Sequence, residues 1–510
     1  MDRRNFIRIS SVALLPIALG LFPDRKEDGS YTIKVNSNRS FGHLLRTNTH
    51  TEPTIHSKID TVIVGGGIAG IAAAYQLRNE SFRLFEGGET LGGSSGAGDW
   101  KSARFATGAH YELAYPKEFG SLLIQTLQEL GIIQWNATTE LYEFTDKKYV
   151  ISTEKMEQCF IAGELVEDIL DEVGDISGFE KLLATYKNEM FLPTRIIDDK
   201  HLHLSAVTFS DFLQEPGVLT NELKERIDYQ MMDDWGAKSD VVSALAGIHY
   251  YSCRPYDDKV VELFSPPQGN YYFIEKMIDA LPKIEAVECN AMVSAIKIKE
   301  DKVFVDVIRR NGEKERVEAN QVIYAGQKHT LKYIMPEAFP LFDQNEYAPW
   351  AVVNLICDKK VNFGKWQNDV LSQEETFLGF VDSNYQHNRS DAYNVITAYY
   401  CFEPKQREEL VNIESSPDQW VKEVIELIEQ ETDTPLSRFV KHVEIKLMGH
   451  AMPIPGVNYL NLKSVPDYDQ KIVFAGVDTG RLPLFSEAFD SGLEAANKVL
   501  LNQEEMKNES

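Results

Sequence analysis

The sequence contains few cysteines, and they are spread widely along the chain. Only five occur in 510 residues, and no two of them form a CxxC pair. An odd, scattered set argues against a disulfide framework and against a structural zinc site, so no metal site is expected. Unpaired cysteines are usually packing residues, and we expect this of Cys159, Cys253, Cys289, Cys357 and Cys401.

Positive charge is scarce as well. Lysine and arginine number 52 against 78 acidic residues, which gives a formal net charge of -26. A chain of this charge repels a phosphate backbone, so nucleic acid is excluded as a partner. The same charge attracts cationic small molecules such as amines, although an acidic surface is more often a solubility feature.

The N-terminus lacks a hydrophobic run long enough to span a bilayer, which takes about 20 apolar residues. The apolar run 9–22 is short and is interrupted by Pro16, and it follows Arg3 and Arg4. The segment RRNFIR resembles the twin-arginine export signal, so we expect residues 1–22 to address the twin-arginine export machinery. This implies an exported protein, periplasmic or membrane-associated through an uncleaved signal, and a general secretory signal or short anchor is the alternative.

The chain also lacks internal repeats and low-complexity segments, and its composition is that of a folded protein, with 43% hydrophobic residues. Its length exceeds what one hydrophobic core usually organises, so two domains are expected. Residues 23–56 are polar and show no helical period, which predicts a linker or irregular arm.

A glycine-rich stretch, VIVGGGIAGIAAAYQL at 62–77, is the strongest motif. Three apolar residues predict a buried parallel strand, and a helix rich in alanine follows. The GxGxxG spacing supplies a tight turn, close approach to a pyrophosphate and close packing of the helix, whose N-terminus favours phosphate. The positions expected to contact the dinucleotide are Gly65, Gly67, Ile68, Ala69 and Gly70.

An acidic residue follows the next predicted strand. Glu86 comes directly after the strand 83–85 and lies 21 residues beyond Gly65. A carboxylate there accepts hydrogen bonds from ribose hydroxyls and disfavours the additional phosphate of NADP. The combination of strand, helix and acidic residue therefore predicts a dinucleotide site, which leaves NAD and FAD open.

Two further motifs decide between them through a resemblance. The segment after Glu86 contains a glycine pair, GGETLGGSSGAGDW, and the C-terminal stretch reads KIVFAGVDTGRLPLFSEAFDSGLEAANKVL. Together with FATGAHYE, these segments resemble the flavin-containing amine oxidase superfamily, which includes amine oxidases, phytoene desaturases and protoporphyrinogen oxidase-like enzymes. The resemblance implies FAD as the cofactor, and it implies that the small residues of the last helix let this helix approach the flavin. The cofactor contacts it implies are Gly92, Gly93, Ser94, Ala109, His110, Val293, Gly476, Asp478, Glu487 and Ala488.

The resemblance also implies the fold class and the domains. The expected class is α/β, in which a Rossmann-like FAD-binding domain is interleaved with a substrate-binding domain of sheet and helices. The FAD-binding domain is expected at 57–115, 270–338 and 455–505. The substrate-binding domain is expected at 116–269 and 339–454.

Local signals between the motifs are consistent with this plan. Thr220 is a candidate N-cap for a helix, and Ser416 with Pro417 marks the start of another. Asn311 followed by Gly312 predicts a hairpin turn between two alternating segments.

Catalytic candidates come from comparing the chain with the superfamily's pattern. Amine oxidases of this superfamily usually carry a lysine on a substrate-domain strand, and here Asn354 takes that place, with Lys359 or Lys360 as the equivalent if the register is shifted. An asparagine cannot carry positive charge, which argues against amine oxidation. His110 in the GAH segment and His450 in GHAMPIPG are the other candidates, as hydrogen-bond donors or proton relays.

The function expected is that of an FAD-dependent oxidoreductase, which dehydrogenates a small molecule such as an amine with hydride transfer to the flavin N5. A desaturase or isomerase acting on an apolar substrate is one alternative, and a non-catalytic flavin-binding partner protein is another. The electron acceptor is left open between oxygen and a quinone. No cysteine lies near the terminal motif, which argues against a thioether link to the flavin there, whereas a link through His110 stays open.

Overall fold

The structure is a computed structural model. It describes residues 31–37, 39–47, 52–110, 119–152, 154, 156–170, 173–253, 262–282, 284–358, 361–386, 392–460 and 464–509. The expected export signal, 1–22, lies outside the described residues, as do Lys359 and Lys360. No helix in the described ranges is both long and apolar enough to cross a membrane.

The first of two large sheets, sheet I, contains the glycine-rich motif. Its strands run in the order β12-β3-β2-β15-β14-β13, with β22 paired to β15 and β21 to β22. The pairs β12-β3, β3-β2, β2-β15 and β15-β22 are parallel, and β13 to β15 form an antiparallel meander. The strands are β2 (Ile55–Val64), β3 (Phe82–Phe85), β12 (Val287–Glu288), β13 (Ala291–Lys299), β14 (Lys302–Arg309), β15 (Lys314–Tyr324), β21 (Asp467–Tyr468) and β22 (Ile472–Phe474).

Helices pack on sheet I where the sequence has its smallest residues. Helix α4 (Ile68–Gln76) contacts α10 (Tyr271–Asp279) and α14 (Phe485–Glu509). A Cβ added at Gly492 of α14 would lie 2.1 Å from the Ala69 carbonyl oxygen, so the small residues of the last helix fit it against α4. The expected approach of this helix to the flavin stays a prediction.

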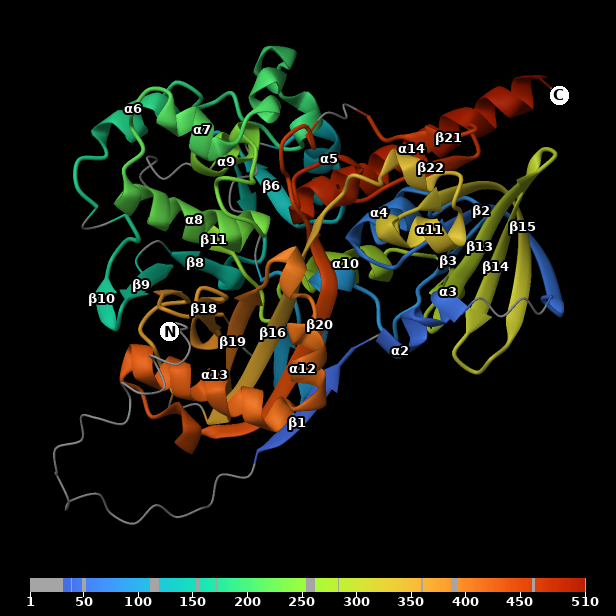
Figure 1. Cartoon of the computed structure of the whole chain (residues 1–510). Coiled ribbons are helices and arrows are strands. Elements are labelled where there is room, and N and C mark those ends of the chain that lie inside the picture. Colours follow the sequence, from blue (N-terminus) through green and yellow to red (C-terminus); the bar gives the residue numbers. More distant parts are fainter. Residues whose placement is uncertain are drawn as a thin grey trace. The chain divides into compact units, whose positions relative to one another are not determined.

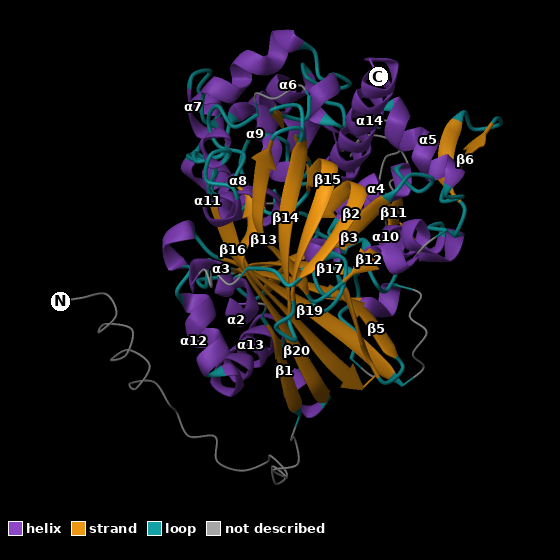
Figure 2. Cartoon of the chain, turned by 90° about the vertical axis from the view of Figure 1, so that its right-hand side faces the viewer, coloured by secondary structure: helices purple, strands orange, loops and turns teal. Residues whose placement is uncertain are grey.

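Sheet II lies beside sheet I in the described chain and has the order β1-β20-β16-β19-β18-β17-β9-β10. Helices α12 (Glu409–Ser415) and α13 (Pro417–Thr432) cover one of its faces, as Figure 2 shows. Figure 1 shows β16, β19 and β20 running side by side at its centre. The strands are β1 (Thr32–Asn36), β9 (Glu157–Ile161), β10 (Glu164–Val166), β16 (Tyr347–Asp358), β17 (Gln367–Leu371), β18 (Phe377–Asp382), β19 (Tyr393–Cys401) and β20 (Val440–Pro453).

Shorter elements complete the described chain. Helix α9 (Ala244–Cys253) contacts α6 (Ser177–Ala184), α7 (Phe209–Gln214) and α8 (Asn221–Trp235). Helix α5 (Ser121–Glu129) contacts α14, and α11 (Leu331–Ile334) follows β15. The two-stranded pairs are β4 (Ala97–Trp100) with β5 (Ala103–Ala106), β6 (Ile133–Asn136) with β7 (Leu141–Phe144), and β8 (Val150–Ser152) with β11 (Glu262–Phe264).

Several local expectations are confirmed. Thr220 caps α8 by accepting a hydrogen bond from the Leu223 amide at 3.1 Å, and Gly312 turns the β14-β15 hairpin with φ +89°. Ser416 occupies the N-cap of α13, but its side chain makes no capping hydrogen bond. Four of the five cysteines are buried, and Cys289 is partly exposed. The α/β class with a Rossmann-like part is confirmed.

The expected linker, 23–56, is wrong in its later part. Residues of β1 pair in parallel with β20, from Thr32 beside His442 to Asn36 beside Lys446. Two short helices follow, α2 (Arg39–Gly42) and α3 (Leu44–Thr47), and β2 already begins at Ile55. The segment lacks a long apolar period because it is assembled from short elements whose partners lie far away in the sequence. The expected domain boundaries otherwise stay a prediction.

Candidate functional site

A cavity of about 1750 Å³ lies between sheet I and sheet II, and both sheets line it. This volume exceeds the 300–1,000 Å³ that is typical of small-molecule sites, so it has room for a dinucleotide together with a substrate. Most of the residues expected at the site line it, namely Gly65, Gly67, Ile68, Ala69, Glu86, Gly92, Gly93, Ser94, Ala109, His110, Val293, His450, Gly476, Asp478 and Ala488.

The glycine-rich loop forms a cradle at one end of this cavity. Gly65 has φ +100°, and a Cβ there would lie 2.9 Å from the Ala325 carbonyl oxygen. A Cβ at Gly70 would lie 1.9 Å from the Gly65 carbonyl oxygen, so Gly70 permits packing inside the turn and does not line the cavity. A Cβ at Gly67 would meet no atom within 4 Å, which leaves open space at the N-terminus of α4. An anion fits this space.

The Glu86 carboxylate is oriented by backbone amides next to the cradle. Its oxygens accept hydrogen bonds from the Gly66 amide at 2.7 Å and from the Gly88 amide at 2.5 Å. Each carboxylate oxygen has a second lone pair, so both can also accept bonds from a bound ribose. Val293, on β13, lines the same part of the cavity. These residues fit the adenosine half of a dinucleotide.

The glycine pair and the GAH segment run against each other. The Ala109 amide donates to the Ser94 carbonyl oxygen at 2.9 Å, and a Cβ added at Gly108 would lie 1.8 Å from that oxygen. The Asn270 amide donates to the Ala109 carbonyl oxygen at 3.1 Å, so the start of α10 supports the same segment. This wall is built from backbone, and it requires glycine at position 108.

Asp478 is engaged by protein donors at the end of β22. Its carboxylate accepts from the Lys328 amide at 2.8 Å, from Lys328 Nζ at 2.9 Å and from the Tyr347 hydroxyl at 3.0 Å. Lys328 is fully buried, and burial lowers its pKa, whereas Asp478 raises it. Asp478 therefore ties the segment after β15 to the end of β22, and its expected contact with the cofactor stays a prediction.

A row of residues from five adjacent strands forms the floor of the cavity. The cross-strand register of sheet II aligns Lys446, Val352, Tyr399, Gly379 and Asp369, and all five line the cavity. At about 4.8 Å per strand, the row spans about 19 Å between its outer Cα atoms. We call this row the cavity floor. It carries a cationic group at one end and an acidic group at the other.

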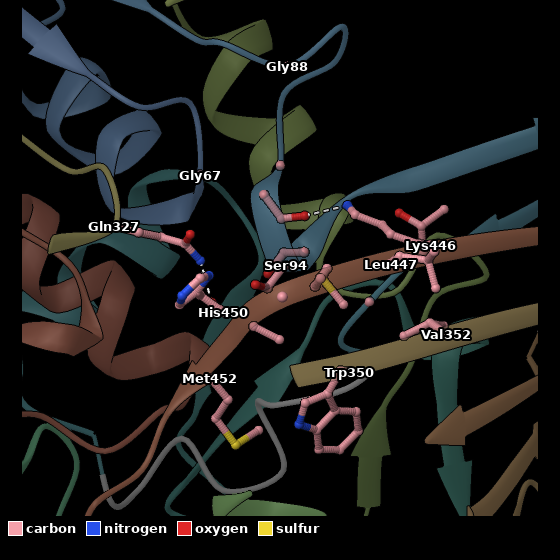
Figure 3. Close-up of a pocket in the computed structure, with 18 of the residues that line it drawn as sticks. Gly67, Gly88, Ser94, Gln327, Trp350, Val352, Lys446, Leu447, His450 and Met452 are labelled. Atoms are coloured by element: carbon pink, nitrogen blue, oxygen red, sulfur yellow. Dashed lines mark hydrogen bonds between the residues drawn. The ribbon is translucent and has the colours of Figure 1, made fainter. Parts of the chain in front are cut away.

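The basic end of the cavity floor lies next to the glycine pair. Lys446 Nζ donates to the Gly93 carbonyl oxygen at 2.7 Å, as Figure 3 shows. Burial lowers the pKa of Lys446 to about 8, against the opposing effects of Glu86 and Glu444. The ammonium group is therefore largely charged at pH 7.

The other end of the cavity floor is acidic. The pKa of Asp369 is raised to about 7, chiefly by burial; the Gln367 side chain lowers this pKa, and the negative charges of Glu157, Asp234 and Asp168 add to the increase. Two carboxylates from the end of α8, Asp233 and Asp234, line the cavity as well. This end therefore favours a cationic ligand.

Aromatic groups border the space between the two ends. His110 and Trp350 both pack edge-on against Tyr399, with ring centroids 5.9 and 6.1 Å apart. His110 Nδ1 lies 3.2 Å from the Gln386 amide nitrogen, which donates to it, so the ring proton is assigned to Nε2. Burial lowers the pKa of His110 to about 3. The ring is neutral, and neither His110 Nε2 nor Trp350 Nε1 has a hydrogen-bond partner among the described residues.

Two further imidazole groups, those of His329 and His450, line the cavity. His450 stacks on His329 with centroids 3.7 Å apart and an interplanar angle of 12°. Burial is the main reason why the pKa of His450 is lowered to about 3 and that of His329 to about 4, and nearby Lys332, Arg407 and Arg46 add to the effect. Neutral His450 can donate or accept a hydrogen bond, but at neutral pH its ring is not in the imidazolium form that would act as a general acid.

Besides Gly70, two expected site residues do not line the cavity, and the first of them is Asn354. Asn354 is fully buried and does not line the cavity, and its Oδ1 accepts from the Thr397 hydroxyl at 2.7 Å. The β4-β5 hairpin covers this part of β16, because Phe105 packs on Ile356. The sequence comparison therefore missed Lys446, which the neighbouring strand β20 supplies to the cavity beside Val352.

Glu487 is the second expected site residue that does not line the cavity. It is fully buried outside the cavity, where it accepts from the Thr194 amide at 2.6 Å and lies 3.5 Å from Arg481. Burial raises its pKa to about 7. It therefore joins the start of α14 to the segment before α7 and cannot touch a ligand in the cavity.

Comparisons with known proteins agree with this geometry. The family model of the NAD(P)-binding Rossmann-like domain matches residues 63–123. A double mutant of putrescine oxidase with redesigned cofactor binding superposes with a TM-score of 0.62 at 16% identity, over 88% of this chain and all of that chain. The chain has the fold of this oxidase.

Two further structures share the oxidase fold. A protein assigned as a protoporphyrinogen oxidase from Exiguobacterium sp. superposes with a TM-score of 0.60 at 15% identity, over 89% of this chain and all of that one. Cyclohexylamine oxidase from Brevibacterium oxydans gives the same TM-score and identity, over 88% of this chain and 99% of that one. A comparison with curated proteins found no match in sequence. The resemblance to the flavin-containing amine oxidase superfamily is thus confirmed for the fold.

Proposed function

We propose that this protein is an FAD-dependent oxidoreductase that dehydrogenates an amine. The observation that carries the proposal is the cavity floor, which runs from the dinucleotide cradle to the carboxylates around Asp369. A protonated amine is attracted to these carboxylates, and the floor is long enough to hold it beside the cofactor. The oxidase fold supports the same assignment.

The cradle fits FAD in its adenosine and pyrophosphate half. The open space at Gly67 accepts the pyrophosphate at the N-terminus of α4, and Glu86 accepts bonds from the ribose. Lys446 places a positive charge between this half and the aromatic region. When bound, FAD supplies an acceptor for two electrons in the form of a hydride.

The residues of the chain position the substrate and keep water away from it. Trp350 and Tyr399 present aromatic surface, which favours a cationic head group and excludes water. His110 offers a neutral N–H, because its Nδ1 is occupied by Gln386. Oxidation of the amine removes a hydride from the carbon and a proton from the nitrogen, and the proton passes to solvent. Water then hydrolyses the released imine to a carbonyl compound and ammonia or a smaller amine.

The proposal favours an amine over an apolar substrate. The carboxylates at this end of the cavity attract a protonated amine, whereas a hydrocarbon offers them no favourable interaction, and burying a charged Asp369 against a hydrocarbon is unfavourable. A desaturase would need an apolar lining at this end of the cavity. The same carboxylates would also have no ligand to recognise in a non-catalytic flavin protein.

We further propose that the chain is exported by the twin-arginine machinery after it has bound FAD, and that oxygen or a quinone reoxidises the cofactor. The RRNFIR segment supports the export route, because this route carries proteins folded around a cofactor. Replacing Arg3 and Arg4 by lysine should leave a flavin-loaded precursor inside the cell. Export that continues unchanged would contradict this part.

The proposed reaction is tested by anaerobic titration of the purified protein. We expect flavin absorbance bands in the protein as isolated, and we expect amines to bleach them when apolar alkenes do not. Asp369→Asn should raise the KM for the reactive amine about tenfold, the value of one lost charged hydrogen bond. The control is Glu375→Gln, which removes an exposed carboxylate outside the cavity. A colourless protein that FAD cannot reconstitute would refute the proposal.

A further inference from the structure

The N-terminal arm, defined here as residues 31–37 and 39–47, connects the two sheets across one end of the cavity. Its strand β1 pairs with β20 at the edge of sheet II. Its helix α3 reaches sheet I, because Leu45 packs against the hydrophobic cluster that includes Val64, Phe85 and Val293. Figure 1 shows β1 at the edge of sheet II, and α2 and α3 follow it towards sheet I.

The arm lines the adenosine end of the cavity. Phe41 is 8% exposed, and with Gly42 and Leu45 it belongs to the same lining as Glu86 and Val293. This phenyl ring is therefore buried against the protein on one side and borders the cavity on the other.

Phe41 is fixed in place from outside. The Arg310 guanidinium lies over its ring at 5.0 Å from the centroid, and Arg310 Nη1 donates to Glu89 Oε1 at 2.9 Å. A ring held in this way offers a rigid apolar surface to a planar base, because it loses little conformational freedom when the base binds.

The arm also brings positive charge to the glycine-rich motif, which has no basic residue of its own. Between Lys58 and Arg78 the glycine-rich motif contains no lysine or arginine. Arg78 and Arg83 follow it, but they are paired with Glu129 and with Glu288 and Glu315 respectively. A bound pyrophosphate therefore needs its cations from elsewhere.

Arg46 of the arm is such a cation. It lines the cavity, and its charge lowers the pKa of both His329 and His450, which lie beside the end of β15. The Gly65 backbone packs against that same end, at Ala325 and Gly326. Arg46 thus acts on the region in which the cradle holds an anion.

We propose that the N-terminal arm is a binding element for the adenosine diphosphate half of FAD, with Phe41 packed against the adenine and Arg46 facing the pyrophosphate. This rests on the proposed cofactor. The arm makes the site selective for the dinucleotide, because FMN lacks the adenine and has only one of the two phosphates. The arm also couples cofactor binding to the pairing of β1 with β20 at the edge of sheet II, since β1 and α2 belong to one continuous segment.

The test measures cofactor affinity rather than turnover. Apoprotein is titrated with FAD and with FMN while flavin fluorescence is followed, and ADP is added as a competitor of FAD. We expect Phe41→Ala to weaken FAD binding about tenfold, because the adenine loses the aromatic surface against which it packs, and to leave FMN binding unchanged within about twofold. Arg46→Gln should weaken FAD and ADP binding together.

Matched controls come from the arm and from sheet I. Leu44→Ala removes an exposed apolar side chain of the same helix that does not line the cavity, and Lys58→Gln removes an exposed cation from β2. Both should bind FAD as the wild type does. Thermal unfolding of each apoprotein shows whether a variant has lost its fold, and Phe41→Leu, which retains apolar bulk, should recover most of the affinity.

The outcomes separate this inference from the proposed function. If Phe41→Ala and Arg46→Gln leave FAD affinity unchanged, or weaken FAD and FMN equally, the arm is not a binding element for the adenosine diphosphate half. If the wild type binds FAD no tighter than FMN, the inference is also overturned, while flavin dependence stands. If the wild type binds neither flavin, the proposed function itself is refuted.

Discussion

Replacing Lys328 by methionine should expose how much stability the buried ion pair with Asp478 contributes. Lys328 is fully buried, and its ammonium group donates to Asp478 Oδ1 at 2.9 Å and to the Gly326 carbonyl oxygen at 3.1 Å. Methionine has nearly the same length and fills the same space, so the change removes the charge with little loss of packing. Asp478 then keeps only the Lys328 amide and the Tyr347 hydroxyl as donors.

The expected loss follows from the burial of the remaining charge. Removing one partner of a buried pair costs about 3–5 kcal/mol, because the other charge is left uncompensated. The double variant Lys328→Met with Asp478→Asn carries no charge at this position, so it should recover all but about 1–2 kcal/mol. Urea unfolding of the apoproteins, followed by tryptophan fluorescence, measures both values without the contribution of a bound cofactor.

Two results would refute this reasoning: a loss below about 1 kcal/mol at pH 7 for Lys328→Met, or a double variant that is as unstable as the single one.

Three further outcomes follow from the structure. Gly70→Ala should abolish FAD binding in a flavin-fluorescence titration, because the new Cβ would lie 1.9 Å from the Gly65 carbonyl oxygen, and a variant with unchanged affinity would contradict this packing. Amine affinity should fall as pH decreases from 8 to 6, because Asp369, with its pKa of about 7, loses its charge, and steady-state KM values should show a flat profile for Asp369→Asn. Thr220→Ala should lower the unfolding free energy by about 1 kcal/mol through loss of the bond to the Leu223 amide, and an unchanged urea midpoint would argue against the cap.

The cofactor cradle could be predicted from the sequence because its parts are local. The turn at Gly65, the start of α4 and Glu86 lie within 22 residues, and each has a steric or hydrogen-bonding requirement that only certain residue types meet. The β14-β15 hairpin at Gly312 was predictable for the same reason. Such features depend on backbone geometry over a few residues, and the residue types at those positions indicate that geometry.

The substrate end could not be predicted, because distant strands create it. Lys446 and Asp369 meet in one row only through the pairing of five strands, and nothing near either residue indicates that row. Asn354 was placed at the cavity from a comparison of strand positions, but the β4-β5 hairpin covers it, and a cover of this kind is a tertiary contact without a local signal. The pattern of β1 was too short to mark a strand.

The position of β1 has a consequence for the order in which the polypeptide assembles. Its first residue, Thr32, finds its partner His442 across a separation of 410 positions, so this contact cannot form until nearly the entire chain has left the ribosome. Pairing over such a separation is entropically expensive and slow, and until it happens β20 remains an unprotected edge on which a second molecule can add a strand. Completion of this sheet is therefore a late event, and conditions that delay it should favour aggregation over maturation.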